Sequence, residues 1–214
     1  MNTLLGIPLS PFVRKVRVVM AEKNLPYDLR PVFPGSDDAE FRALSPLGKI
    51  PAFSDERIGL ADSSVICAYL EKSHPTPALL PADPVAYAHA LWFEEYADTK
   101  LFHVCTEGLF FERIVKGRMR GEPADEAKVA ASLKELPAVC DYLEQKISAG
   151  ALGGGAFSLG ELAVTTQFVN LNHAGEQVDA ASFPKLAALL KKTLARPSFQ
   201  LCLEDEKSLM ASLG

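Results

Sequence analysis

Three short stretches in the first eighty residues place hydroxyl and carboxyl groups at predicted helix starts and turns. The first is Ser10-Pro11-Phe12-Val13. Serine is a favoured N-cap and proline a favoured first helical residue, so a helix should begin at Pro11. A helix N-terminus favours an anion, and a hydroxyl that accepts a bond from the helix keeps a hydrogen to donate. We therefore interpret Ser10 as a donor to a ligand thiolate. The alternative is a capped helix with no further role.

A hydrogen bond from Ser10 is expected to lower the pKa of a ligand thiol appreciably. A free thiol titrates near ~8.5, and lowering its pKa by one unit requires about 1.4 kcal/mol of preference for the thiolate. One charge-assisted hydrogen bond contributes roughly 1.5–3 kcal/mol, which corresponds to one to two units. Ser10 is not expected to be a nucleophile itself, because no GxSxG surrounds it and no histidine lies within sixty residues to act as its base.

The second stretch is Gly48-Lys49-Ile50-Pro51-Ala52. A proline that opens a short strand after a turn is either an ordinary edge residue or the site of a cis peptide bond. A cis bond would turn the Ile50 backbone outward, so that its N–H and carbonyl could pair with a peptide-like ligand as an added strand.

The third stretch, Asp62-Ser63-Ser64, starts another predicted helix. Ser63 and its N–H suit a carboxylate at the helix N-terminus, and Asp62 suits an amino group. Together these are the requirements of an α-amino acid head group. The alternative is again N-capping alone.

These stretches belong to a region in which the period of the apolar residues changes repeatedly. The pattern predicts a strand, helix, strand, short helix and two strands, at about 3–6, 11–23, 27–32, 39–44, 50–53 and 58–61. A last helix starts at Asp62-Ser63-Ser64 and has apolar residues from Val65 to Leu70. The first unit implies a parallel strand pair with a right-handed crossover, and the second a hairpin followed by a helix. This is an α/β domain, which we place at 1–78.

The remaining chain shows only helical patterns. A proline-rich segment indicates a linker, placed at 79–85, and an all-helical domain follows at 86–214. Helices are expected at about 86–112, 125–149, from 159, 183–195 and 197–206. Ser158 and Glu161 form a capping box for the third of these. The Gly153-Gly154-Gly155 run follows no strand, so we interpret it as a loop and not as a phosphate cradle.

Composition excludes several classes of function. The chain has 214 residues, a formal net charge of −5 and no basic stretch, so nucleic acid is not an expected ligand. The longest uncharged runs have 14 residues, too few to span a bilayer, and no signal peptide is evident, so we expect a cytoplasmic protein without membrane attachment. The four cysteines and four histidines lack metal-site spacing, so no metal is expected.

Three motifs, Leu9–Arg17, Ser45–Pro51 and Ala61–Leu70, resemble those of a cytosolic glutathione S-transferase with a serine active site. The resemblance covers the whole chain, including the capped helix at Phe157-Ser158-Leu159 and the closing Arg196-Pro197-Ser198-Phe199. It implies a thioredoxin-like fold up to about residue 78, a helical bundle after it, and a homodimer. These motifs specify the family well and the substrate poorly.

The resemblance also implies roles for individual residues. Ser10 would hydrogen-bond the glutathione sulfur, and Ile50 would pair by its backbone with the cysteinyl unit, beside a cis Pro51. Asp62 and Ser63 would hold the γ-glutamyl end. The resemblance also implies, less specifically, that Lys49 lies near the glycine carboxylate of glutathione.

Two departures from the family pattern bear on these roles. Asp62 stands where many members have Glu or Gln, which shortens the reach to the glutathione amine. Gly160-Glu161 stands where many have Ala-Asp, although the capping box survives the change. Arg14, one turn beyond Ser10, could add positive potential at the thiolate. The alternative places Arg14 and Lys15 on an exposed, solvated helix face.

Candidates for the electrophile pocket come from both halves of the chain. Along the long helix, six residues recur at spacings of four and three and so share one face: Trp92, Tyr96, Thr99, His103, Thr106 and Phe110. We propose Phe12, Tyr96 and His103 as pocket residues, the alternative being plain helix–helix packing. The cysteines are interpreted as buried small hydrophobes.

The resulting functional expectation is a detoxifying transferase in which the glutathione thiolate attacks a small hydrophobic electrophile. A second expectation keeps glutathione as a true cofactor, in an isomerase, a reductive dehalogenase or an etherase, with the same site. A third is a binding or regulatory protein that retains the fold without catalysis, which the short Asp62 favours.

Overall fold

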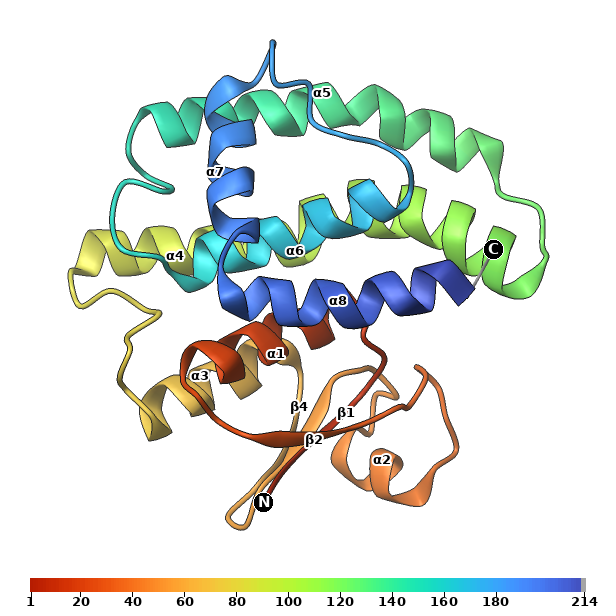
Figure 1. Ribbon diagram of the computed structural model, residues 1–214, viewed down its shortest axis with the longest axis vertical. Coiled ribbons are helices and arrows are strands. Elements are labelled where there is room, and N and C mark those ends of the chain that lie inside the picture. Colours follow the sequence, from red (N-terminus) through yellow and green to blue (C-terminus); the bar gives the residue numbers. More distant parts are fainter. Residues whose placement is uncertain (213–214) are drawn as a thin grey trace. The chain divides into compact units, whose positions relative to one another are not determined.

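Four short strands form the sheet that carries the N-terminal part of the chain: β1 (Asn2–Leu5), β2 (Tyr27–Arg30), β3 (Ala52–Ser54) and β4 (Gly59–Ala61). Their spatial order is β2-β1-β3-β4. β1 pairs with β2 in parallel, whereas β3 is antiparallel to both β1 and β4. The predicted parallel pair and hairpin are therefore confirmed, and the arrangement is thioredoxin-like. The computed structural model describes residues 1–212 (Figure 1).

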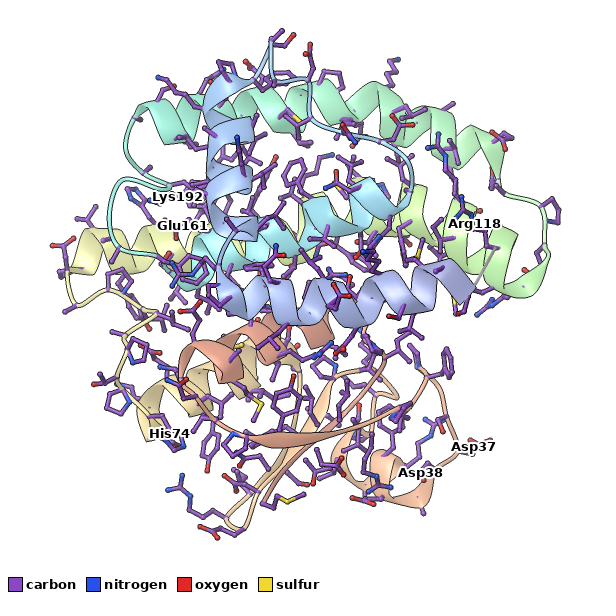
Figure 2. The ribbon with its side chains drawn as sticks, in the orientation of Figure 1. Asp37, Asp38, His74, Arg118, Glu161 and Lys192 are labelled. Atoms are coloured by element: carbon purple, nitrogen blue, oxygen red, sulfur yellow. The ribbon has the colours of Figure 1, made fainter. Side chains whose placement is uncertain are left out.

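Three helices accompany this sheet, and each begins at a residue that accepts hydrogen bonds from the first turn. They are α1 (Pro11–Glu22), α2 (Ala39–Leu44) and α3 (Ser63–Ser73). Their N-caps are Ser10, Asp38 and Asp62, as polar side chains at these positions predict. α1 packs against α3, while α2 contacts β3 and β4; Figure 2 labels Asp38 at the start of α2.

Helix α1 differs from the expectation in being buried on all sides. Arg14 and Lys15 are both 0% exposed, so the alternative that placed them on a solvated face is wrong. The reason lies at the other end of the sequence, in α8 (Pro197–Ser212). Nε and Nη2 of Arg14 donate to Oε1 and Oε2 of Glu206, each at 2.6 Å. A bidentate carboxylate is what a buried guanidinium requires.

Other polar residues of α1 are also engaged by α8. Arg17 donates to Asp205 and, through Nε, to the Tyr27 hydroxyl at 2.8 Å. Ser198 donates to Glu22 at 2.5 Å. The first ten residues of α8 therefore belong to the same compact unit as the sheet, which consists of Met1–Leu79 and Pro197–Glu206.

The second compact unit comprises Leu80–Arg196 and the end of α8 from Lys207, and it is helical. Its helices are α4 (Pro84–Tyr96), η1 (Ala97–Met119), α5 (Glu126–Ser148), α6 (Leu159–His173) and α7 (Pro184–Leu194). The expected fold class, an α/β part followed by a helical part, is thus confirmed. The domain bounds differ, because residues 197–206 of the predicted helical domain belong to the first unit and α4 already begins within the predicted linker 79–85. The long helix predicted at 86–112 consists of α4 and its continuation η1, where the winding becomes that of a π-helix.

Helix α6 is the core of this unit. Every residue from Leu159 to Leu171 is buried, and α4, η1 and α7 all pack on it. The predicted capping box is present, with Glu161 accepting from the Ser158 N–H at 2.9 Å. No helix in the described part of the chain is both long and apolar enough to cross a membrane.

Candidate functional site

Ser10 occupies the position that its sequence context predicts. Its side chain accepts from the Val13 N–H at 3.4 Å, and its carbonyl accepts from the Arg14 N–H at 2.9 Å. The residue is 9% exposed. An N–H···O distance of 3.4 Å is long, so the hydroxyl is only weakly engaged by the helix and keeps its own hydrogen to donate. An anion at the start of α1 would meet this hydroxyl together with the N-terminal N–H groups of the helix.

Gly6 explains how the start of α1 comes close to the second predicted stretch. A Cβ at this position would lie 2.4 Å from Cγ2 of Val13 and 3.4 Å from Cβ of Ile50. No side chain fits there, because real Cβ atoms do not approach a neighbour so closely. The end of β1, the first turn of α1 and the segment before β3 are therefore in contact.

The peptide bond between Ile50 and Pro51 is cis. The turn before it is held by the Ser45 hydroxyl, which donates to the Lys49 carbonyl at 2.7 Å and accepts from the Lys49 N–H at 3.1 Å. Within residues 1–212, no hydrogen bond engages the main chain of Ile50, while Ala52 already pairs with Leu5 in the sheet. The Ile50 N–H and carbonyl are thus unengaged within the described residues, as expected of a backbone that receives an added strand. Lys49 itself is exposed.

Asp62 has a strained backbone, with φ 78° and ψ 127°. Non-glycine residues in such conformations cost about 1–3 kcal/mol and cluster at functional sites. One oxygen, Oδ1, accepts from the N–H groups of Ser64 at 2.9 Å and Val65 at 3.2 Å. Asp62 is exposed, whereas the neighbouring Ser63 is only 3% exposed. Capping thus occupies Oδ1, and Oδ2 takes no hydrogen bond from the described residues.

The positive charge of Arg14 is not free to act at the start of α1. The bidentate bond to Glu206 brings a full negative charge to the guanidinium, with both side chains 0% exposed. This compensation argues against the interpretation that Arg14 adds positive potential beside Ser10.

Two of the three predicted pocket residues, Phe12 and Tyr96, belong to different compact units and are described separately. Phe12 is partly buried in the first turn of α1. In the helical unit, the ring of Tyr96 lies 4.7 Å from that of Tyr142 on α5. Burial, and then the neighbouring Tyr142, raises the pKa of Tyr96 to about 12. Tyr96 therefore stays protonated at neutral pH.

His103 is exposed and engaged with a carboxylate. Its Nδ1 lies 2.8 Å from Oε2 of Glu107, with 62% of its own side chain exposed. The two residues line a cavity between η1 and α5, together with Lys128 and Glu135. This lining is charged, unlike the apolar wall expected of a pocket for a hydrophobic electrophile.

The single face predicted along the long helix is divided. The Thr106 hydroxyl donates to Gln167 on α6 at 2.7 Å, and the ring of Phe110 packs 6.2 Å from that of His173. A π-helix has more residues per turn than the 3.6 of an α-helix, so spacings of three and four drift around its axis. Tyr96 consequently faces α5, whereas Thr106 faces α6.

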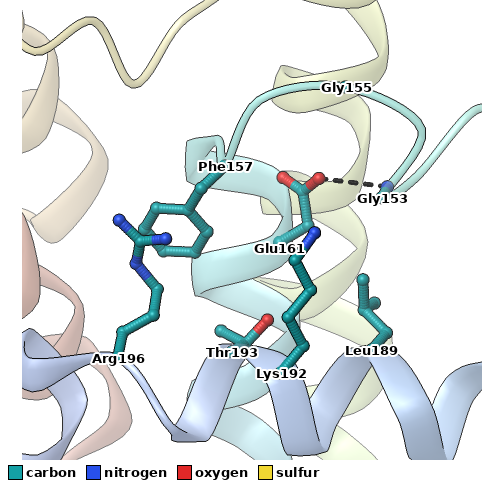
Figure 3. Close-up of a pocket in the computed structure, with 8 residues that line it drawn as sticks. All are labelled: Gly153, Gly155, Phe157, Glu161, Leu189, Lys192, Thr193 and Arg196. Atoms are coloured by element: carbon teal, nitrogen blue, oxygen red, sulfur yellow. Dashed lines mark hydrogen bonds between the residues drawn. The ribbon is translucent and has the colours of Figure 1, made fainter.

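A second cavity lies beside the glycine loop of the helical unit (Figure 3). Glu161 extends toward this loop and accepts from the Gly153 N–H at 3.0 Å. Arg196 stacks over the Phe157 ring at 4.0 Å, and Lys192 lines the same cavity. Because a carboxylate already takes a loop N–H, the interpretation of this segment as a loop fits better than a phosphate cradle.

The four cysteines are buried, as expected, and none forms a disulfide with another described residue. Burial raises the pKa of Cys140 to about 12 and that of Cys202 to about 11. A thiol whose pKa is raised in this way stays protonated at neutral pH and is a poor nucleophile, because the thiolate is the reactive form. Among residues 1–212 there is no group of three or more metal-ligating side chains.

The first unit thus joins a weakly engaged hydroxyl, an unpaired backbone segment and a strained helix start on a thioredoxin-like frame. Residues 4–78 match the family described as Glutathione S-transferase, N-terminal domain. The chain is 30% identical over 206 residues to a glutathione S-transferase from Hyoscyamus muticus, covering 93% of this chain and 96% of that protein. This protein belongs to the glutathione S-transferase family.

Two further relatives show the range of the similarity. The crystal structure of a glutathione S-transferase from Rhodospirillum rubrum matches with a TM-score of 0.87 and 26% identity, over 95% of this chain and 92% of that one. FtsZ-localized protein A from Caulobacter vibrioides is 26% identical over 209 residues, covering 95% of this chain and 91% of that protein.

Proposed function

We propose that this protein is a glutathione transferase that activates the glutathione thiol as a thiolate for attack on a small hydrophobic electrophile. The observation that carries this proposal is the weakly engaged Ser10 hydroxyl at the start of α1, in the same compact unit as Ile50 and Ser63. Family membership makes glutathione the ligand that fits this arrangement.

In the proposed mechanism Ser10 donates its hydroxyl hydrogen to the glutathione sulfur. This bond favours the ionised form, and the N-terminus of α1 favours it further. The thiol proton passes to solvent water. The thiolate then attacks the electrophilic carbon of the second substrate, forming a carbon–sulfur bond as the leaving group departs with the electron pair of its bond. With roughly 1.5–3 kcal/mol from one charge-assisted bond, the thiol pKa falls by one to two units.

The rest of glutathione would be held along the same unit. The Ile50 backbone would pair with the cysteinyl unit beside cis Pro51, and Lys49, which is exposed, would meet the glycine carboxylate. Ser63, at the first position of α3, would take the γ-glutamyl carboxylate, and Asp62 would bind the amine through Oδ2. The strained backbone of Asp62 supports a role there beyond capping.

We also propose that the protein acts as a homodimer. Support comes from α4, where large apolar side chains are exposed: Val85 at 62%, Tyr87 at 42%, Leu91 at 38% and Trp92 at 50%. Val85 and Trp92, seven positions apart, share one side of α4, and exposed apolar side chains that gather in this way are typical of an interaction surface. For contact with the electrophile, Phe12 remains our candidate in the first unit; within the helical unit Tyr96 is favoured over His103, whose surroundings are charged.

The decisive test is the replacement Ser10→Ala, with Ser10→Thr as a matched control that keeps a hydroxyl. We expect Ser10→Ala to lower turnover at neutral pH about 10- to 100-fold with little change in glutathione affinity. Ultraviolet titration of bound glutathione should show the thiol pKa returning toward ~8.5 in the alanine variant and not in the threonine variant. Unchanged turnover and an unchanged thiol pKa in Ser10→Ala would remove Ser10 from the mechanism.

A second candidate function is a binding or regulatory role without catalysis. The observation that favours it is that the carboxylate of Asp62 is short and already caps α3 through Oδ1. The relationship to a protein named for its localization with FtsZ is consistent with such a role. Calorimetric binding of glutathione, without turnover on a panel of electrophiles, would support it. Isomerase, dehalogenase or etherase activity would use the same site and would emerge from the same substrate panel.

A further inference from the structure

Two buried lysines connect α1 to α3, one in the second turn of α1 and one at its C-cap. Lys15 is 0% exposed and donates through Nζ to the Ser64 hydroxyl at 3.2 Å. Lys23 is also buried; its Nζ lies 2.7 Å from Oε2 of Glu71 and donates to the His74 carbonyl at 2.7 Å. Figure 2 labels His74 just beyond the end of α3.

The two lysines link different ends of α1 and α3. Ser64 follows Ser63 in the first turn of α3, and Lys15 lies five residues after Ser10 in α1. The Lys15 contact therefore links the two helix starts that carry the proposed glutathione site. The Lys23 contact links the same helices at their other ends, away from both starts. A buried ammonium is held firmly because leaving its acceptors is costly.

We propose that Lys15 is a positioning residue for glutathione. It fixes the first turn of α3, which would hold the γ-glutamyl carboxylate, relative to the first turn of α1, which would hold the sulfur. Its ammonium group also brings positive charge to the turn that receives the carboxylate. This inference rests on the proposed function, because it assigns the two helix starts to two ends of one ligand.

The role of Lys15 predicts a specific pattern of ligand dependence. If its effect passes through the γ-glutamyl carboxylate, then a glutathione analogue without that carboxylate, (4-aminobutanoyl)cysteinylglycine, should be insensitive to its removal. If Lys15 serves the fold alone, both ligands should lose affinity equally. Turnover at saturating glutathione should change little, because Lys15 does not contact the reacting sulfur.

The experiment compares Lys15→Met with Lys23→Met in the full-length protein, by calorimetric titration with glutathione and with the analogue. We expect Lys15→Met to weaken glutathione binding about 10-fold and to raise KM similarly, with kcat and analogue affinity within about twofold of the parent. Lys23→Met should lower the melting temperature but leave both affinities within about twofold.

A smaller change guards against a Lys15→Met variant that does not fold. Ser64→Ala removes only the hydroxyl that accepts from Lys15, and it should weaken glutathione binding in the same selective way by a few-fold. Equal losses for glutathione and the analogue, or equal losses in the Lys15 and Lys23 variants, would overturn the proposal while leaving the proposed function intact. Failure of the parent protein to bind glutathione would overturn both.

Discussion

Helices α1 and α6 are both buried along their length, but they satisfy their polar groups in opposite ways. α1 carries Arg14, Lys15 and Arg17 into the interior, and partners from distant segments neutralise or bind them. α6 carries uncharged polar residues such as Thr165 and Thr166, whose hydroxyls donate to carbonyls of the same helix.

The difference shows how each helix is specified. α6 is apolar nearly all round, and its two neighbouring threonines find acceptors within the helix, while Gln167 accepts from Thr106 of η1. Its burial therefore follows largely from its local sequence. α1 has cations where a surface helix would have them, and their burial depends on Glu206 and Asp205 of α8 and on Ser64 of α3. Loss of a single polar group should therefore lower the free energy of unfolding more when it contacts α1 than when it lies in α6.

The largest effect is expected from Glu206→Gln. This change removes the carboxylate charge from a buried guanidinium, and breaking a buried ion pair costs about 3–5 kcal/mol. The midpoint of urea denaturation should fall accordingly. Glu40→Gln is the matched control, because Glu40 pairs with Arg30 at the surface, where such pairs contribute about 0–1 kcal/mol. A loss below about 1 kcal/mol in Glu206→Gln would mean that α1 does not depend on the charge of its partner.

An intermediate effect, with a pH signature, is expected from Glu112→Gln in η1 of the helical unit. The hydrogen bond from Lys116, and then that from the Asp125 N–H, holds the pKa of Glu112 below its ordinary value of 4.5. A carboxyl whose pKa is lowered on folding stabilises the protein above its unfolded pKa and loses this contribution as pH falls through the folded one.

We therefore expect Glu112→Gln to cost about 1 kcal/mol at pH 7. The difference from the parent should shrink as the pH is lowered from about 5 to below the pKa of the folded state. Melting temperatures of both proteins across this range measure it. A difference that stays constant on acidification would show that the carboxylate charge of Glu112 is not what stabilises the junction with α5.

The smallest effect is expected from Thr165→Val in α6. The Thr165 hydroxyl donates to the Glu161 carbonyl at 2.7 Å, and valine has nearly the same shape without the donor. Removing a hydroxyl whose partner retains its helical bond should change the free energy of unfolding by less than about 1 kcal/mol. A loss above about 2 kcal/mol in urea denaturation would remove the contrast with α1.

Local sequence patterns were sufficient for the order of the elements and for three of the helix starts, whereas the long helix runs beyond its predicted bounds of 86–112, from Pro84 to Met119. The caps at Ser10, Asp62 and Ser158 involve residues within a few positions of one another, and all three are confirmed. Ile50 and Pro51 likewise follow a turn whose hydrogen bonds are local. The roles of these residues toward a ligand remain predictions.

Interactions between distant segments were not predictable in the same way. Arg14 and Glu206 are separated by 192 positions, and nothing within one helical turn of Arg14 distinguishes a buried cation from a solvated one. The link from Lys15 to Ser64 was missed for the same reason. The face of the long helix was divided because its winding changes at Ala97, which no period of 3.6 anticipates.

The return of α8 to α1 has a consequence for how the protein is made. The chain emerges from the ribosome N-terminus first, and domains usually fold as they appear. Here the carboxylates that neutralise Arg14 and Arg17 lie 192 and 188 positions further along the chain. Helix α1 therefore keeps its cations hydrated until α8 has been synthesised. The first compact unit, which carries the proposed glutathione site, can be completed only after the helical segment between its two parts has emerged.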